Sequence, residues 1–195
     1  MNLFKKHIHP VLGLVLVFAV LNGIILYRLY SMGYFNKGGH LSAIAPAPAF
    51  ELTERGGRTL TNADLAGKVW VGSFIFTRCG GPCPMMSLRT QELVRKVPGV
   101  TAVSFTSDPA FDTPEVLSKY AQNYKADAEQ WLFLTGPMTE MSRIAKEFKF
   151  GGIDQPDLHS TRFVLVDGKG QVRGYYDSND PEHLARLERD AKSLL

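Results

Sequence analysis

The chain has 195 residues, a hydrophobic content of 45% and a formal net charge of +3, values that suit one globular domain with an appendage. All 19 acidic residues lie at Glu51 or later, whereas only four of the 22 lysines and arginines precede that position. The main domain is therefore close to neutral and contains no lysine- or arginine-rich run. We expect no nucleic-acid partner.

Residues 8–27 form a mainly apolar run of 20 residues, and within residues 11–26 Asn22 is the one strongly polar side chain. The run is long enough for a hydrocarbon core of about 30 Å, and it exceeds the roughly 7–15 apolar residues of a cleaved signal peptide. We therefore predict a cytoplasmic tail over residues 1–9 and one transmembrane anchor over residues 10–30. Two lysines in the tail favour a cytoplasmic N-terminus.

With that orientation, we expect the rest of the chain in the periplasm of a bacterium, or on the outer face of its cytoplasmic membrane, where disulfides are permitted. Residues 31–48 are rich in Gly, Ser, Ala and Pro, and extended proline-containing segments act as semi-rigid spacers. We predict that they form a linker, outside the core, to a domain over residues 49–195.

Within this domain, apolar runs, caps and turn residues predict alternating strands and helices. Thr113 is expected to cap one helix and Thr139 another. The pattern ends in a hairpin and a helix, which predicts an α/β sandwich with a mixed central sheet. The expected strands are 50–53, 59–60, 69–76, 100–106, 131–134, 163–166 and 171–176, and the expected helices are 61–64, 84–96, 114–124, 139–148 and 181–194.

The only two cysteines, Cys79 and Cys83, lie between the buried strand and a helix expected to begin at Pro84. Partial positive charge at a helix N-terminus lowers a thiol pKa, so we expect Cys83 to favour the thiolate that attacks disulfides and binds metals. The spacing alone leaves both a disulfide and a metal site open. A purely structural disulfide would close a small loop and stabilise the fold only modestly.

Three sequence blocks, in this order, resemble the Sco/SenC family of membrane-anchored, copper-handling proteins with a thioredoxin-like fold. They are FIFTRCGGPCP at 74–84, FTSDP at 105–109 with DTPEVL at 112–117, and HS at 159–160 followed by FVLVD at 163–167. The resemblance covers nearly the whole domain, and the N-terminal anchor agrees with it. It implies a thioredoxin-like sandwich with a mixed sheet, preceded by one transmembrane helix.

The resemblance also implies that Cys79, Cys83 and His159 bind copper. Two thiolates and an imidazole are a soft donor set suited to Cu(I), and a three-ligand site leaves room for the further ligand that Cu(II) would take. A structural zinc site would require a fourth protein ligand. The other histidine of the domain, His183, is expected to be a solvated residue of the last helix.

Several neighbouring residues have weaker interpretations. Asp157 either orients the ring of His159 or is a solvated loop charge, the interpretation that we favour. At helical spacing, one of Met85 and Met86 is expected in the core and the other at the surface.

Many members of the family carry a polar residue between the cysteines, where this chain has Gly-Gly-Pro. Ser160 stands where thioredoxin-like reductases have a proline, which favours a metal site over a reductase.

These features predict a copper metallochaperone that assists assembly of the binuclear copper centre of cytochrome c oxidase. Its partner would be the copper-accepting oxidase subunit or another cuproprotein. The alternative is a membrane-anchored thiol–disulfide oxidoreductase that uses Cys79 and Cys83. The sequence does not decide between a binding protein and an enzyme, but it favours the binding protein. A peroxidase ranks last, because Arg78 adjoins Cys79 without the proline–threonine context that peroxidases use.

Overall fold

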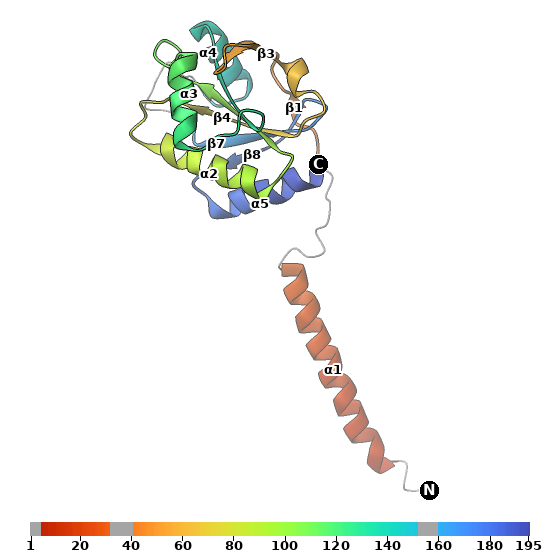
Figure 1. The fold of residues 1–195 in the computed structure, drawn as a ribbon. Coiled ribbons are helices and arrows are strands. Elements are labelled where there is room, and N and C mark those ends of the chain that lie inside the picture. The colour runs from red at the N-terminus through yellow and green to blue at the C-terminus, as the bar shows by residue number, and fades with distance from the viewer. Residues whose placement is uncertain (1–4, 32–40, 152–159) are drawn as a thin grey trace. The chain divides into compact units, whose positions relative to one another are not determined.

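The computed structural model describes residues 5–31, 41–151 and 160–195, which fall into two compact units, 1–40 and 41–195 (Figure 1). The first unit contains helix α1 (Lys5–Ser31), so the predicted N-terminal helix is present. Among the residues that the structure describes, however, no helix combines the length and the apolarity needed to cross a membrane. The predicted transmembrane crossing is therefore not supported by the structure.

The second unit is built on one eight-stranded sheet with the order β1-β8-β7-β4-β5-β6-β2-β3. Strands β4, β5 and β6 are parallel, and every other pairing is antiparallel, which confirms a mixed sheet. The strands are β1 (Ala45–Pro46), β2 (Glu51–Glu54), β3 (Thr59–Thr61), β4 (Trp70–Ile75), β5 (Thr101–Thr106), β6 (Trp131–Thr135), β7 (Arg162–Val166) and β8 (Gln171–Asp177).

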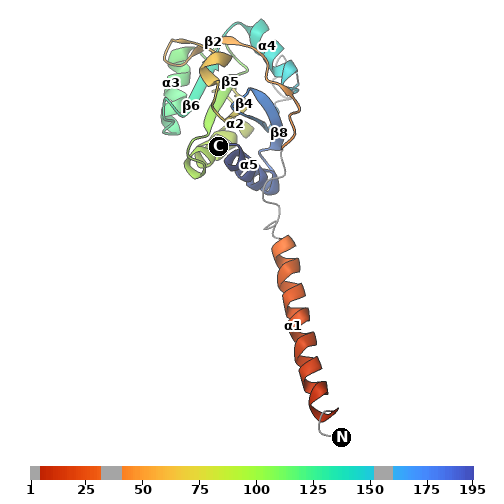
Figure 2. The ribbon, with the colours of Figure 1, turned by 90° about the vertical axis from the view of Figure 1, so that its right-hand side faces the viewer.

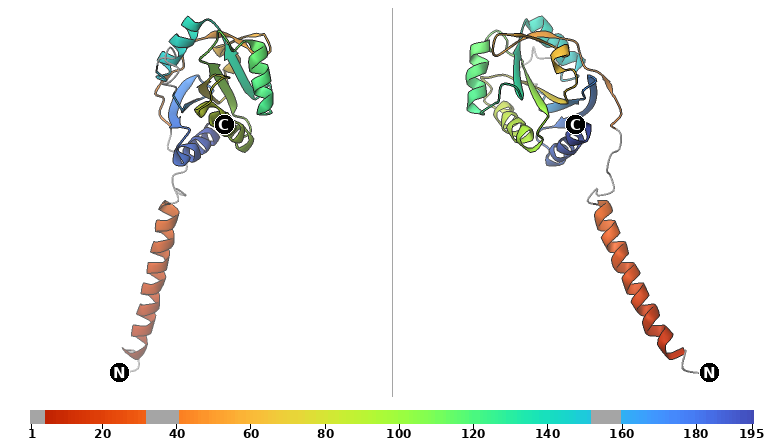
Figure 3. Two further views of the ribbon diagram at one scale, coloured as in Figure 1. Left: turned by 90° about the vertical axis from the view of Figure 1, so that its left-hand side faces the viewer. Right: turned by 45° about the vertical axis from the view of Figure 1, so that its right-hand side comes forward.

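Helices cover both faces of this sheet (Figure 2). On one face lie α2 (Pro82–Lys96), α3 (Pro114–Asn123) and α5 (Pro181–Leu194), and α2 and α5 run side by side in each view (Figure 3). On the other face lie α4 (Met138–Glu147) and the short 3-10 helix η1 (Asn62–Leu65).

Successive side chains of the central strands enter different cores. In β6, Leu132 and Leu134 pack in the cluster beneath α4, whereas Trp131 and Phe133 pack in the cluster beneath α3. All five residues of this strand are buried. A strand covered on both faces must be apolar on both faces, which explains why the central strands appear in the sequence as continuous apolar runs.

Three elements differ from the sequence-based expectations. Residues 45–46, expected in the linker, form strand β1 and pair with Val172 and Gln171 of β8, because the outer edge of β8 offers unpaired backbone groups. Helix α2 begins at Pro82, where a missing N–H costs nothing in the first turn. Helix α4 begins at Met138 after Pro137, so Thr139 lies inside the helix and is not its cap.

Candidate metal centre

The two cysteines lie where β4 ends and α2 begins. Residues 76–81, here termed the cysteine loop, leave β4, and the backbone N–H of Cys79 donates to the carbonyl of Phe76 at 3.2 Å. Cys79 is half-buried, whereas Cys83 lies in the first turn of α2 and is 1% exposed. The Cys79 side chain lies close enough to Cys83 to raise the pKa of the Cys83 thiol. The fold therefore brings both sulfur atoms together, with one of them reachable from solvent.

Burial, reinforced by the neighbouring Cys79 thiol, raises the pKa of the Cys83 thiol to about 12. The sequence-based expectation of a lowered pKa is therefore wrong for Cys83. Its side chain packs with apolar residues that include Ile75 and Leu117. The loss of hydration exceeds the benefit of the helix N-terminus, because burial disfavours the charged form of a thiol. Loading a metal on this thiol must release its proton.

A buried carboxylate fixes the start of the cysteine loop. Asp112, which is fully buried, accepts hydrogen bonds from the hydroxyls of Thr77 and Thr106, each at 2.5 Å, and from the Thr77 backbone N–H at 3.2 Å. Thr77 leaves the end of β4 and Thr106 ends the neighbouring parallel strand β5. Asp112 thus joins the two loops at the edge of the sheet that carries the thiols.

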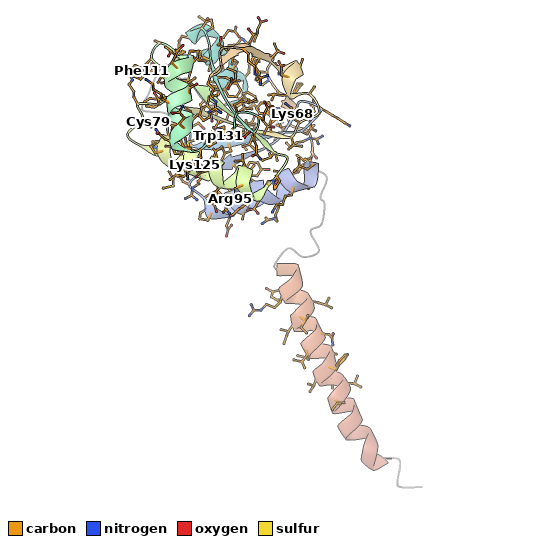
Figure 4. The ribbon with its side chains drawn as sticks, in the orientation of Figure 1. Lys68, Cys79, Arg95, Phe111, Lys125 and Trp131 are labelled. Carbon is orange, nitrogen blue, oxygen red and sulfur yellow. The ribbon has the colours of Figure 1, made fainter. Side chains whose placement is uncertain are left out.

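A second, exposed contact joins the same two loops. The Arg78 guanidinium pairs with the Asp108 carboxylate at 2.5 Å and lies over the ring of Phe111, 4.0 Å from its centroid. Figure 4 shows Phe111 and Cys79 along the same edge of the domain. The cysteine loop is therefore held by a buried anchor on one side and by an exposed cation–π and ion-pair contact on the other.

Sequence reasoning assigned no role to Asp112, Thr77 or Phe111. One signal was available: Thr77 follows one strand of the predicted sheet, and residues 108–112 follow the next. The carboxyl ends of adjacent parallel strands meet at one edge, so hydroxyl and carboxylate groups at these positions come together. What the sequence left open was which strands are adjacent.

Two predicted site residues, His159 and Asp157, lie outside the residues that the structure describes. Strand β7 runs antiparallel to β4, with Val164 opposite Gly72, so the start of β7 lies at the edge where β4 ends and the cysteine loop begins. Across residues 5–31, 41–151 and 160–195, no group of three His, Cys, Asp or Glu is placed to hold a metal. The predicted set of Cys79, Cys83 and His159 stays a prediction.

The other residues considered from the sequence are now placed. Met86 is buried in the core and Met85 is exposed, which confirms the expected division between core and surface. His183 accepts a hydrogen bond from the backbone N–H of Asp177 at 3.0 Å through its Nδ1 atom. This ring helps to join β8 to α5 and is not merely solvated.

A mixed sheet covered by helices on both faces, with two thiols at the start of a helix, defines a dithiol domain of the thioredoxin-like class. The SCO1/SenC family model matches residues 40–192, and the chain belongs to this family. The SCO1 protein homolog of Bacillus subtilis is 33% identical over 155 residues, which cover 74% of this chain and 80% of the relative.

Two solved structures extend the comparison. BsSco, described as a member of the Sco family of cytochrome c oxidase assembly proteins with a disulfide switch, is 30% identical with a TM-score of 0.71, over 78% of this chain and 95% of the other. Yeast Sco1 with copper bound is 25% identical with a TM-score of 0.60, over 79% of this chain and 97% of the other. These matches agree with the predicted thioredoxin-like fold.

Proposed function

We propose that this protein is a copper chaperone that carries copper for the assembly of cytochrome c oxidase. The observation that carries the proposal is the adjacent pair of thiols at one sheet edge in a SCO1/SenC chain. The solved relatives include an oxidase assembly protein and a copper-bound protein. Thiolates are soft donors that suit Cu(I), so the donor set fits copper as a cargo. The acceptor would be the copper-accepting oxidase subunit or another cuproprotein.

We propose Cys79, Cys83 and His159 as the copper ligands. Support for the two thiols is their mutual contact and the partial exposure of Cys79. Support for His159 is its position shortly before β7, whose first residues lie at the edge from which the cysteine loop leaves β4. Because both sulfur atoms must be deprotonated to bind metal, loading requires the reduced dithiol and releases protons.

The test is copper analysis of the reduced domain, residues 41–195, beside its His159→Ala and His183→Ala variants. Wild type should bind one copper per chain, and His159→Ala should lose more affinity than the roughly 10- to 100-fold that loss of an outer-shell partner costs. His183→Ala, a change in a histidine that contacts the backbone of Asp177, should keep wild-type affinity. Unchanged Cu(I) affinity in His159→Ala would refute the three-ligand set.

A thiol–disulfide oxidoreductase is the second candidate. One observation favours it: half-buried Cys79 lies beside buried Cys83, the arrangement of an attacking thiol and a resolving thiol. Reduction of insulin disulfides should then survive His159→Ala and disappear in Cys79→Ser. A domain that reduces insulin at the rate of a thioredoxin but retains no copper would favour this candidate over the chaperone.

We further propose that the N-terminal helix attaches the protein to a bacterial inner membrane, with the copper domain on the periplasmic side. Support comes from the apolar run over residues 8–27 and the two lysines before it. Fractionation of cells that express the full chain or residues 41–195 tests the proposal. Only the full chain should sediment with membranes, and external protease should reach its domain in spheroplasts.

A further inference from the structure

A groove lies between helices α2 and α5, which run side by side (Figure 3). Its volume is about 220 Å³, less than the roughly 300–1,000 Å³ of sites for drug-sized ligands. Neither cysteine is among the described residues that line it. The groove therefore has room for a small molecule, apart from the dithiol. Its apolar lining consists of Leu93, Phe163, Pro181, Leu184, Ala185 and Leu187.

The charged residues of the groove differ in their pairing. The Lys96 ammonium lies 2.7 Å from the Glu92 carboxylate and 3.7 Å from the Glu188 carboxylate, and Glu188 also pairs with Lys192 at 2.7 Å. These two carboxylates and two ammonium groups balance one another. Within the described part of the chain, Arg89 forms no ion pair or hydrogen bond, so the guanidinium is the charge of the groove that lacks a partner.

The Nε atom of Arg89 is buried and has no hydrogen-bond acceptor. Among the described residues, the only other buried side-chain nitrogen or oxygen atom without a hydrogen bond is Glu54 Oε1, which lies 3.5 Å from the Nε atom of Arg55. A buried donor without a partner costs free energy, and the cost is larger for a charged group. A ligand that brings acceptor oxygens into the groove would therefore favour a rotamer of Arg89 that turns the guanidinium towards it.

We propose that this groove binds a small monocarboxylate with an apolar body, and that the Arg89 guanidinium holds the carboxylate. The two groups match in a bidentate, charge-assisted pair, and the apolar lining would remove the rest of the ligand from water. Glu92 and Glu188 border the same groove, so a dianion such as phosphate meets more repulsion than a single negative charge does. The site goes beyond the proposed function and does not rest on it.

The probe that tests the site is 4-fluorophenylacetate, an aromatic monocarboxylate whose fluorine NMR signal broadens on binding. The full, reduced and metal-free chain is titrated at pH 7, and 4-fluorophenylacetamide serves as the uncharged ligand of nearly the same shape. Arg89→Met removes the guanidinium, and Ala185→Trp fills the groove from an exposed position. Arg95→Met is the matched control, because Arg95 is an exposed arginine of α2 (Figure 4) that does not line the groove.

Wild type should bind the carboxylate saturably at one site, and at least about tenfold more tightly than the amide, because the pair is charge-assisted. Arg89→Met and Ala185→Trp should each weaken binding at least about tenfold, whereas Arg95→Met should stay within about twofold of wild type. Arg89→Met should also keep at least wild-type stability in urea, because it removes a buried donor that has no partner. Inorganic phosphate at equal concentration should not displace the probe.

Wild-type affinity in Arg89→Met, or equal affinity for the acid and the amide, would overturn the role of the guanidinium. Wild-type affinity in Ala185→Trp would place the probe outside the groove, and an equal loss in Arg95→Met would reduce the effect to general charge. Binding by wild type that does not saturate, or displacement by phosphate, would overturn the monocarboxylate site. Lower stability of Arg89→Met would overturn it as well, because it would show that the guanidinium supports the fold.

Discussion

At the scale of single residues, the site contains two buried polar groups, Asp112 and Cys83, whose surroundings differ. Asp112 is buried with hydrogen-bond donors around its carboxylate, whereas Cys83 is buried among apolar side chains and beside a second thiol. A buried charged group is tolerated when donors compensate its lost hydration, and a buried thiol stays neutral when they do not. Asp112 therefore supports the loop, whereas the Cys83 thiol stays protonated.

Replacement of Asp112 by asparagine should destabilise the domain. The amide removes the negative charge and one acceptor from a site that faces the hydroxyl and N–H donors of Thr77, so we expect a loss of about 1–3 kcal/mol. Urea unfolding followed by the fluorescence of the two buried tryptophans measures it. Asp108→Asn is the control, because its pair with the exposed Arg78 is worth about 1 kcal/mol or less. Equal losses of unfolding free energy in both variants would show that the buried Asp112 contacts stabilise the domain no more than the exposed ion pair does.

The two thiols should differ in their reaction with iodoacetamide. Because the pKa of Cys83 is raised to about 12, its thiolate fraction at pH 8 is very small, and we expect Cys79 to react at least about tenfold faster. The thiolate fraction of Cys83 should rise about tenfold per pH unit below that pKa. Mass spectrometry of the reduced, metal-free domain resolves the two sites, and equal rates would contradict the burial of Cys83.

The raised pKa of Cys83 also makes the stability of the domain depend on pH. The folded-state pKa of Cys83 lies above its ordinary value of 9.0, so the unfolded chain loses this proton first as the pH rises. The contribution of the protonated Cys83 thiol to the free energy of unfolding is therefore complete below about pH 9, and it is lost as the pH rises to about 12. The difference in urea stability between wild type and Cys83→Ala over that interval isolates the effect.

At the scale of elements, helices α3 and α5 begin with strong local signals. Thr113 caps α3, with its Oγ1 accepting from the backbone N–H of Val116, and Asp180 caps α5. Both helices have proline in their first position, where its fixed φ suits a helix and its missing N–H is not needed. Such caps are local, and the sequence predicted both helix starts. The predicted start of α2 at Pro84 was wrong by two residues, because Pro82 and Pro84 both suit the first turn of a helix and the helix begins at Pro82.

Asp180→Ala should weaken the C-terminal helix. The Asp180 carboxylate accepts from the backbone N–H groups of Glu182 at 2.8 Å and of His183 at 3.4 Å, and loss of such a cap costs about 0.5–2 kcal/mol. Asp180→Asn should retain most of the stability, since asparagine caps a helix nearly as well. Thermal unfolding followed by circular dichroism measures both variants, and an equal loss in the two would point to charge rather than capping.

At the scale of the whole molecule, the unit formed by residues 41–195 has its own hydrophobic core. Every buried residue of the three core clusters lies within residues 41–195 of the described chain. Strand β1 closes the outer edge of β8 within the same unit. The residues before position 41 therefore contribute no core side chain among those described.

Removal of residues 1–40 should leave the stability of the domain unchanged. We expect urea unfolding free energies of the full chain and of residues 41–195 to agree within about 0.5 kcal/mol, the level at which independent sites add. Removal of residues 1–47 instead deletes β1 and the contact of Ala47 with the main core, and should destabilise the domain measurably. A large loss on the first truncation would contradict the independence of the unit.

The sequence by itself determined most elements of this protein, because caps, prolines and apolar runs act over a few residues. Near-continuous apolar runs predicted the buried strands, and the Cys79–Cys83 spacing predicted a dithiol site. Only the tertiary structure decided what lies around those thiols. The adjacency of β4 and β5 brings Asp112 to Thr77, and the packing of α2 buries Cys83 and raises its pKa. These effects depend on which distant segments exclude water from a group, and no local pattern of residues contains that information.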